Sequence, residues 1–223
     1  MSGWLLPKSL LRWCVRVIGW AFAALTLLVL IFGFFNLPFT PYIASERARL
    51  GEIRQDWVRL EEINPHLRRA VLAAEDASFC AHWGFDIDAL RAAIADGARR
   101  GGSTITQQTV KNVFLWQGRS WIRKGLEAGI TPLVELIWPK HRILEVYLNV
   151  AEFDEGVFGA QAASQWYFGI DASDLSLAQA SGLASVLPNP KERSARAPGN
   201  RGVRIADGAQ TLARDGRAAC IED

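Results

Sequence analysis

The sequence has 223 residues, which is enough for one domain of ordinary size and a short appendage. Its 25 Lys and Arg residues nearly balance its 23 Asp and Glu residues, and the net charge is only +2. A general nucleic-acid-binding protein would need a strongly basic face, so we expect no nucleic acid partner.

An apolar run over residues 17–37 is the first predicted element, and it is long enough for a transmembrane anchor. The run contains no charged residue, whereas Lys8, Arg12 and Arg16 precede it. Positive charge on the N-terminal side places residues 1–16 in the cytoplasm and the rest of the chain outside. A cleaved signal peptide is the alternative, but the small residues of a cleavage site do not follow the run.

A polar connector is predicted over residues 38–63, and a helix that begins at Pro65 behind a capping asparagine follows it. The helix has apolar residues along one face and ends at Glu75. Apolar neighbours and the helix C-terminus both disfavour ionisation, so the carboxyl of Glu75 suits proton transfer near neutral pH. An ordinary helix-end acid that pairs with Arg68 or Arg69 is the alternative.

A glycine pair, Gly101 and Gly102, ends the next predicted helix and lets the backbone approach a ligand closely. The helix that follows, capped by the adjacent serine or threonine, aligns Thr104, Gln108 and Lys111 on one face. Free N-terminal amides, an amide side chain and an ammonium group suit an anionic or sugar ligand. A polar face exposed to water is the alternative.

Residues 114–124 mix aromatic, aliphatic and cationic side chains, as in a segment at the level of lipid headgroups. A buried hairpin between core helices is the alternative. A helix then runs to Trp138, and on it Arg123 and Lys124 lie one turn before Glu127. Such pairs are commonly surface salt bridges of small energy.

Further helices are predicted over 143–149 and 176–187, and a weak one over 205–212 precedes a frayed tail. No segment alternates as a half-buried strand does, so the chain beyond the anchor is predicted to be mostly α-helical. The three cysteines are odd in number and far apart, so no disulfide framework is predicted. We interpret His82 and Asp86 as hydrogen-bonding groups and not as a metal pair.

Five ordered motifs carry a family resemblance. They are Glu-Asp-x-x-Phe-x-x-His-x-Gly at 75–84, Gly-Gly-Ser-Thr-Ile-Thr-Gln-Gln at 101–108, Arg-Lys-x-x-Glu at 123–127, Ile-Leu-Glu-x-Tyr-Leu-Asn at 143–149 and Ala-x-x-Leu-Pro-x-Pro at 184–190. Together they resemble the peptidoglycan glycosyltransferases, glycosyltransferase family 51. The resemblance implies a mostly α, lysozyme-like helical domain over 64–198 with a small membrane-proximal lobe, preceded by the transmembrane helix and followed by a C-terminal tail over 199–223.

The implied substrates are lipid II and the growing glycan chain, joined by inverting transfer to the acceptor 4-hydroxyl with release of undecaprenyl pyrophosphate. By similarity, Glu75 is the general base and Glu127 the second catalytic carboxylate. The residues implied to hold the first motif or to bind substrate are Asp76, Phe79, His82, Thr104, Gln108, Lys111, Asn112, Arg123 and Lys124. Gly101, Gly102 and Glu145 are implied to be structural, Glu145 as an acid that fixes the arginines of the site.

The resemblance requires no cofactor and allows a divalent cation, Mg²⁺ or Mn²⁺, at the pyrophosphate, for which the sequence shows no dedicated ligands. It implies a single-pass protein of the bacterial inner membrane with a periplasmic catalytic domain, and cell-wall synthesis or division proteins as partners. One departure is Asp154, which stands where the family has glycine. We expect a local backbone adjustment there and retained activity.

A leaving pyrophosphate needs cations more than a strong acid, and Lys111, Arg123 and Lys124 supply them. A membrane-bound lytic transglycosylase or muramidase is the alternative function, and it would need a protonated acid and no cationic cluster. A membrane-tethered scaffold without turnover is the non-enzymatic alternative, against which Glu75 and Glu127 argue. No Ser-x-x-Lys or Lys-Thr-Gly motif occurs, so we expect no transpeptidase activity.

Overall fold

The structure is a computed structural model that describes residues 8–36, 39–95, 102–118 and 120–222. The chain forms two compact units, Met1–Asn36 and Leu37–Asp223.

The described part of the first unit contains one helix, α1 (Lys8–Phe34), of 27 residues. At about 1.5 Å per residue it is about 40 Å long, so it exceeds a hydrocarbon core of about 30 Å. Its length and apolar composition fit a single-pass membrane anchor. The helix begins well before the predicted residue 17 because Lys and Arg are good helix formers and continue it beyond the apolar run. Residue 37, the predicted end of the anchor, lies outside the described residues.

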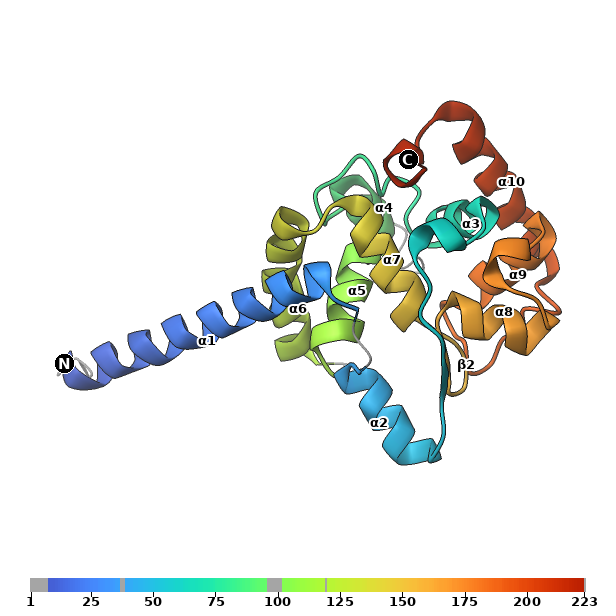
Figure 1. Ribbon diagram of the computed structural model, residues 1–223. Helices are drawn as coiled ribbons and strands as arrows, with labels where there is room; N and C mark the ends of the chain where they lie inside the picture. The colour runs from blue at the N-terminus through green and yellow to red at the C-terminus, as the bar shows by residue number, and fades with distance from the viewer. Residues whose placement is uncertain (1–7, 37–38, 96–101, 119, 223) are drawn as a thin grey trace. The chain divides into compact units, whose positions relative to one another are not determined.

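The second unit is mostly helical, as predicted (Figure 1). Its α-helices are α2 (Pro41–Leu50), α3 (Pro65–Glu75), α4 (Ile87–Ala95), α5 (Ile105–Phe114), α6 (Trp121–Ile137), α7 (Lys140–Val150), α8 (Ala160–Phe168), α9 (Leu177–Val186) and α10 (Gly199–Asp215). Its strands and 3-10 turns are β1 (Arg54–Gln55), β2 (Glu152–Asp154), β3 (Val157–Phe158), η1 (Leu60–Glu62), η2 (Ala172–Asp174) and η3 (Ala219–Ile221).

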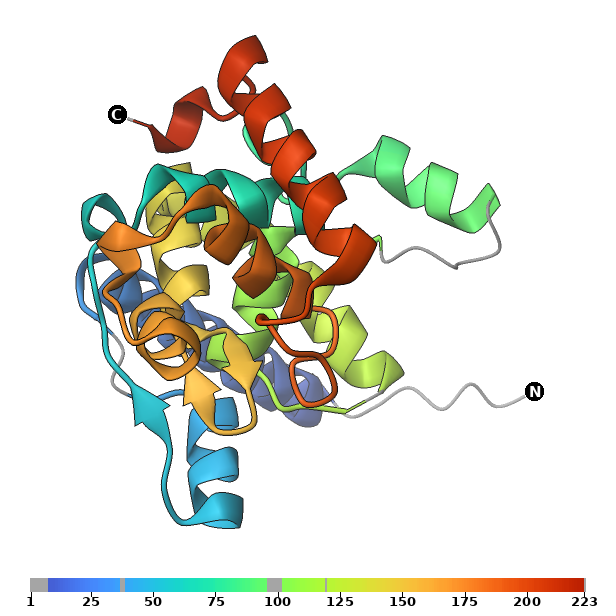
Figure 2. The same ribbon diagram turned by 90° about the vertical axis from the view of Figure 1, so that its right-hand side faces the viewer.

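Two groups of helices build the core of this unit. In one group α5 packs against α6 and α7, and in the other α3 packs against α9 and α10. Figure 2 shows α10 lying across α3 and α9. N-caps are present at Asn64, Thr104, Ser120 and Ser176, and each side-chain oxygen accepts a hydrogen bond from the first turn of its helix.

The segment 38–63 was expected to be a connector, and its described part, residues 39–63, is folded against the rest of the second unit. It holds α2, β1 and η1, and Ile43, Leu60 and Ile63 are buried. The backbone amide of Arg54 donates to the carbonyl of Gly156 at 2.8 Å, and β1 runs parallel to β3 in a sheet of order β1-β3-β2. Strands of two or three residues are too short to show an alternating pattern, which is why the sequence did not predict them.

The expected C-terminal tail is the long helix α10, packed on α3. Gly202 and Gly208 lie inside it, and glycine lowers helix propensity, so the sequence predicted only a weak helix. Gly208 has a structural use, since a Cβ there would lie 3.0 Å from the Cβ of Ala73 on α3. The glycine therefore lets the two helices approach closely.

The prediction of no disulfide is wrong, because Cys80 and Cys220 form one, with their Cα atoms 5.7 Å apart. The two cysteines are separated by 140 residues in the sequence. Only the packing of α10 on α3 brings the end of the chain back to the loop that follows Glu75, and spacing alone does not reveal such proximity. Cys14 is the free cysteine.

Breaking this disulfide is expected to destabilise the second unit. A cross-link over so long a loop typically contributes about 2–4 kcal/mol. Cys80→Ser and Cys220→Ser should each lower the midpoint of thermal unfolding by several degrees, measured by circular dichroism in detergent. Cys14→Ser is the matched control and should unfold like wild type. Equal midpoints for Cys14→Ser and Cys80→Ser would contradict the expectation.

Candidate active site

Glu75 is the last residue of α3, and its side chain is only 12% exposed. Its Oε2 accepts a hydrogen bond from Nε2 of Gln108 at 2.9 Å, and its Oε1 lies 3.6 Å from a guanidinium nitrogen of Arg201. The alternative pairing with Arg68 or Arg69 is wrong. Arg68 donates to the carbonyl of Ile221 at 2.9 Å, and Arg69 pairs with Glu222.

Burial raises the pKa of Glu75 above its ordinary value, as the apolar helix face predicted. The hydrogen bond from Gln108 and the charges of Arg201 and Lys111 oppose this effect, and the charge of Asp76 adds to it. Desolvation is the largest of these influences, and the net direction of the pKa shift is upward. A carboxyl with a raised pKa is a stronger base when ionised and can exchange a proton near neutral pH.

Gln108 is held in place by a second contact. The hydroxyl of Tyr147, on α7, donates to its Oε1 at 3.2 Å, and Tyr147 is almost fully buried. Because the amide oxygen is occupied in this way, the amide nitrogen is turned toward Glu75. The chain Tyr147–Gln108–Glu75 therefore links α7, α5 and α3 at the carboxyl group.

Asp76 joins the first motif to the second. Its Oδ1 lies 2.8 Å from Nε2 of His82, and its Oδ2 accepts from the backbone amide of Ile105 at 2.9 Å. Thr104 is buried as the N-cap of α5, and its hydroxyl donates to the carbonyl of Gly84 at 2.7 Å. Asp76, His82 and Thr104 thus fix the loop after Glu75 to the start of α5, and Thr104 does not offer a free hydroxyl on a polar face.

Phe79 is fully buried in the same loop, and Nζ of Lys140 lies 4.5 Å from the centre of its ring. Lys140 also pairs with Glu135 on α6, at 2.8 Å, and Glu135 accepts from the hydroxyl of Thr106 at 2.6 Å. The sequence analysis missed Glu135 and Lys140. A charged residue within an apolar helix face was the available signal for Glu135.

Glu127 is buried on α6, and both of its carboxylate oxygens accept hydrogen bonds from cations. A guanidinium nitrogen of Arg123 lies 2.7 Å from Oε2, and the ammonium group of Lys124 contacts Oε1. Lys124 also donates to the hydroxyl of Ser103 at 3.1 Å. These contacts differ from exposed salt bridges because Glu127 and Arg123 are largely shielded from water.

Lys111 interacts electrostatically with both carboxylates, Glu75 and Glu127. Burial lowers its pKa, the charges of Arg123 and Lys124 act in the same direction, and the charges of Glu127 and Glu75 oppose them. Within the described residues its ammonium group has no ion pair or side-chain hydrogen bond. A largely buried cation without a protein partner is suited to an anionic ligand.

Gly102 and Asn112 both have structural surroundings. Gly101 lies outside the described residues, and a Cβ at Gly102 would lie 3.3 Å from Cδ1 of Leu90. Asn112 is buried, and its Oδ1 accepts from the side chain of Gln117 at 3.1 Å.

Glu145 has the predicted structural character but holds a different arginine. It pairs with Arg142 and accepts from the backbone amide of Leu60 at 2.9 Å, so it ties α7 to η1 and does not touch Arg123. The departure at Asp154 is accommodated in strand β2, where its Oδ2 accepts from the indole of Trp166 at 2.9 Å.

A cavity of about 260 Å³ lies beside Glu75. It is lined by Ala73, Ala74, Glu75, Asp76, Ala77, Ser78, Asp86, Ala89, Gly102, Ser103 and Thr104.

Arg201 contacts Glu75 from α10, in the part of the chain that was expected to be a tail. No pattern in the sequence marked Arg201, since its contact depends on how α10 packs on α3.

A divalent ion at the pyrophosphate does not fit the residues around Glu127, because both carboxylate oxygens already accept hydrogen bonds from cations. Asp76, His82 and Asp86 offer ligand atoms within 4.8 Å of one another. However, Asp76 is bonded to His82 and to a backbone amide, and Asp86 accepts from the amide of Ala89 at 2.7 Å. Each of these three groups therefore already makes a contact that holds the loop.

The chain is similar to known proteins along most of its length. Residues 44–210 match the family model described as Transglycosylase. A biosynthetic peptidoglycan transglycosylase of Jannaschia sp. (strain CCS1) is 56% identical over 221 residues, 97% of this chain and 92% of the relative. Proteins of the same name from Pseudomonas putida (strain W619) and Pseudomonas syringae pv. syringae (strain B728a) are 51% and 49% identical, each over 86% of this chain and 85% of the relative.

The titration of Glu75 should respond to its two polar partners and not to the arginines near it in sequence. Gln108→Ala and Arg201→Gln each remove an influence that lowers the pKa of Glu75, so each should move its titration midpoint upward. Carbon-13 NMR of labelled glutamate, assigned by the loss of one signal in Glu75→Gln, measures the midpoint. Arg68→Gln is the control and should leave it unchanged. If only Arg68→Gln shifted the titration midpoint of Glu75, the result would favour the alternative in which Glu75 pairs with Arg68.

Proposed function

Because the chain belongs to the transglycosylase family and is a peptidoglycan glycosyltransferase of cell-wall synthesis, we propose that it polymerises lipid II with Glu75 as its general base. The observation that carries this proposal is the buried Glu75 carboxyl, with its raised pKa and its orientation set by Gln108 and Arg201. The Glu75 carboxylate takes the proton of the acceptor 4-hydroxyl, and the acceptor oxygen then attacks the anomeric carbon of the donor. The bond between that carbon and the pyrophosphate breaks, and the configuration inverts.

The leaving pyrophosphate requires positive charge, and α5 and α6 supply it. Lys111 has no ion pair among the described residues, and Arg123 and Lys124 are held in place by Glu127. Preorganised cations stabilise the charge that develops on a leaving group without having to reorganise during the reaction. In this proposal Glu127 positions the two cations, and a metal ion takes no part.

An apolar surface supports attachment to the bilayer beyond the anchor. Large apolar side chains are exposed on α4, on α6 and on the connection before α6, namely Ile87, Leu90, Ile94, Trp116, Trp121, Ile122 and Leu136. Trp121, 92% exposed, precedes Arg123 and Lys124, a composition typical of interfacial segments. This exposure argues against the buried hairpin, and we propose that this apolar surface contacts the lipid headgroups.

The disulfide supports a periplasmic domain. Disulfides form and persist in oxidising compartments and are rare in the cytoplasm of mesophilic bacteria. The Cys80–Cys220 bond lies in the second unit, and the basic residues that precede the apolar run of α1 favour a cytoplasmic N-terminus. Both features support a single-pass protein of the inner membrane whose catalytic unit lies outside the cytoplasm.

The proposed reaction is tested by polymerisation of fluorescent lipid II in detergent. Wild type should make polymer that lysozyme digests, and Glu75→Gln should be slower by about 100- to 10,000-fold, the usual contribution of a general base. Glu61→Gln, which changes an exposed acid just before α3, should keep wild-type activity. No polymer from wild type, with shortening of preformed strands, would support the lytic alternative instead.

The stability of Glu75→Gln separates chemistry from folding. The pKa of Glu75 is raised in the folded state, so protonated Glu75 stabilises the fold at low pH. This contribution to the free energy of unfolding is lost as the pH rises through the folded-state pKa. At pH 7 the neutral glutamine removes a desolvated charge, and we expect the unfolding midpoint to equal or exceed that of wild type. A strongly lowered midpoint would mean that lost activity reports lost structure.

The compartment is tested by counting free thiols in cells. Proteins precipitated in acid and treated with a polyethylene-glycol maleimide should gain one label, at Cys14, without reductant and three labels after reduction. Three labels before reduction would show that the disulfide does not form in the cell and would remove its support for a periplasmic domain.

A further inference from the structure

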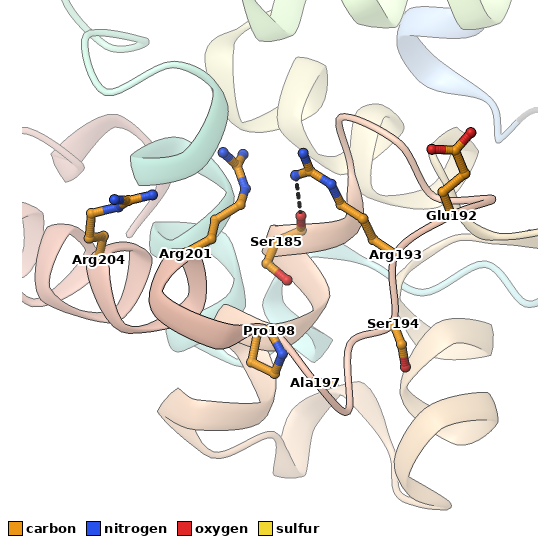
Figure 3. A pocket seen from close by; sticks show the side chains of 8 residues that line it. All are labelled: Ser185, Glu192, Arg193, Ser194, Ala197, Pro198, Arg201 and Arg204. Carbon is orange, nitrogen blue, oxygen red and sulfur yellow. Dashed lines mark hydrogen bonds between the residues drawn. The ribbon is translucent and has the colours of Figure 1, made fainter.

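A second cavity, of about 630 Å³, lies where the end of α9, the loop after it and the first turns of α10 meet. It is lined by Ser185, Glu192, Arg193, Ser194, Ala197, Pro198, Arg201 and Arg204. In Figure 3 the guanidinium groups of Arg193 and Arg201 point the same way, with Ser185 between them, and Arg204 follows on the next turn of α10. We call this cavity the arginine pocket.

The arginine pocket carries a surplus of positive charge. Burial lowers the pKa of Arg201, and the positive charges of Arg193 and Arg204 act in the same direction, so the three cations lie within electrostatic reach of one another. Among the described residues, the side chain of Arg193 donates only to the backbone carbonyl of Ser185, at 3.2 Å. Neither Arg193 nor Arg204 forms a salt bridge within the described part of the chain. Three cations with one acid, Glu192, leave room for an anionic ligand.

Arg201 connects the arginine pocket to the proposed base. It lines the pocket and lies 3.6 Å from Oε1 of Glu75, and its buried Nε has no hydrogen-bond partner among the residues that the structure describes. The cations assigned to the leaving pyrophosphate come from different elements, α5 and α6, and Lys111 is the one whose charge reaches Glu75. Glu75 is therefore shared by two cationic clusters. If the cluster on α5 and α6 serves the donor, the arginine pocket faces the acceptor.

We propose that the arginine pocket binds a carboxylate of the peptide carried by the acceptor substrate, an inference that rests on the proposed function. A guanidinium group presents a planar pair of donors that matches a carboxylate. The pocket also contains the acid Glu192, which suits the amides and positive charges of a peptide. A site for a pyrophosphate alone would be expected to exclude an acid.

The test compares two substrates in each enzyme. One is lipid II with its peptide carboxylates intact, and the other is lipid II in which every peptide carboxylate is a carboxamide. The pyrophosphate and the sugars are identical, so the ratio of the two kcat/KM values isolates the peptide charge. Wild type should prefer the carboxylate substrate by about threefold to fivefold, the effect of a partly exposed ion pair.

Arg204→Gln is the diagnostic variant, because Arg204 lines the pocket without touching Glu75. It should bring the kcat/KM ratio close to one, mainly through a higher KM for the carboxylate substrate. Arg214→Gln is the matched control, an exposed arginine on the same helix outside the pocket, and should keep the wild-type ratio.

Two results would overturn the proposal while leaving the glycosyltransferase assignment intact. One is an unchanged ratio in Arg204→Gln, and the other is an equal loss on both substrates, which would mean that the arginines bind phosphate or only support the fold. No polymer from wild type with either substrate would instead remove the proposed function itself, together with this inference.

Discussion

The site depends on keeping the Glu75 carboxyl out of water while still holding it with polar groups. Its three neighbours come from three different helices, with Gln108 on α5, Arg201 on α10 and Tyr147 on α7 behind Gln108. A buried carboxyl without partners would simply stay protonated, and one that was tightly paired with a cation would stay ionised. One amide at hydrogen-bond distance and one guanidinium at 3.6 Å leave Glu75 between these extremes.

Glu127 shows what the opposite arrangement produces. It is more deeply buried than Glu75, yet two cations contact its two oxygens directly. A carboxylate with both oxygens occupied in this way is well suited to hold Arg123 and Lys124 in position. The two glutamates can therefore have different roles. Glu75 exchanges a proton, whereas Glu127 positions Arg123 and Lys124, and Lys111 interacts electrostatically with both glutamates.

The sequence predicted the parts of the site that are local. Helix caps, the helix end at Glu75 and the one-turn spacing of Arg123 and Glu127 follow from neighbouring residues, and the structure contains them. The mostly helical fold was predicted for the same reason. What the sequence did not predict depends on long-range packing, as for Arg201 and for the Cys80–Cys220 bond. Glycines inside α10 weakened its helical signal, although Gly208 is what allows α10 to pack closely against α3.

The C-terminal part of the chain helps to set the electrostatic environment of Glu75. Cys220 is bonded to Cys80, five positions after Glu75 in the sequence, and Arg68 and Arg69 hold Ile221 and Glu222. These contacts fasten the end of the chain after α10 to α3 and its following loop, and the opposite end of α10 carries Arg201 to Glu75. A helix of 17 residues attached in this way cannot rotate or slide without breaking one of these contacts. The residues that the sequence presented as a tail therefore hold a guanidinium group at a fixed position beside the carboxyl group.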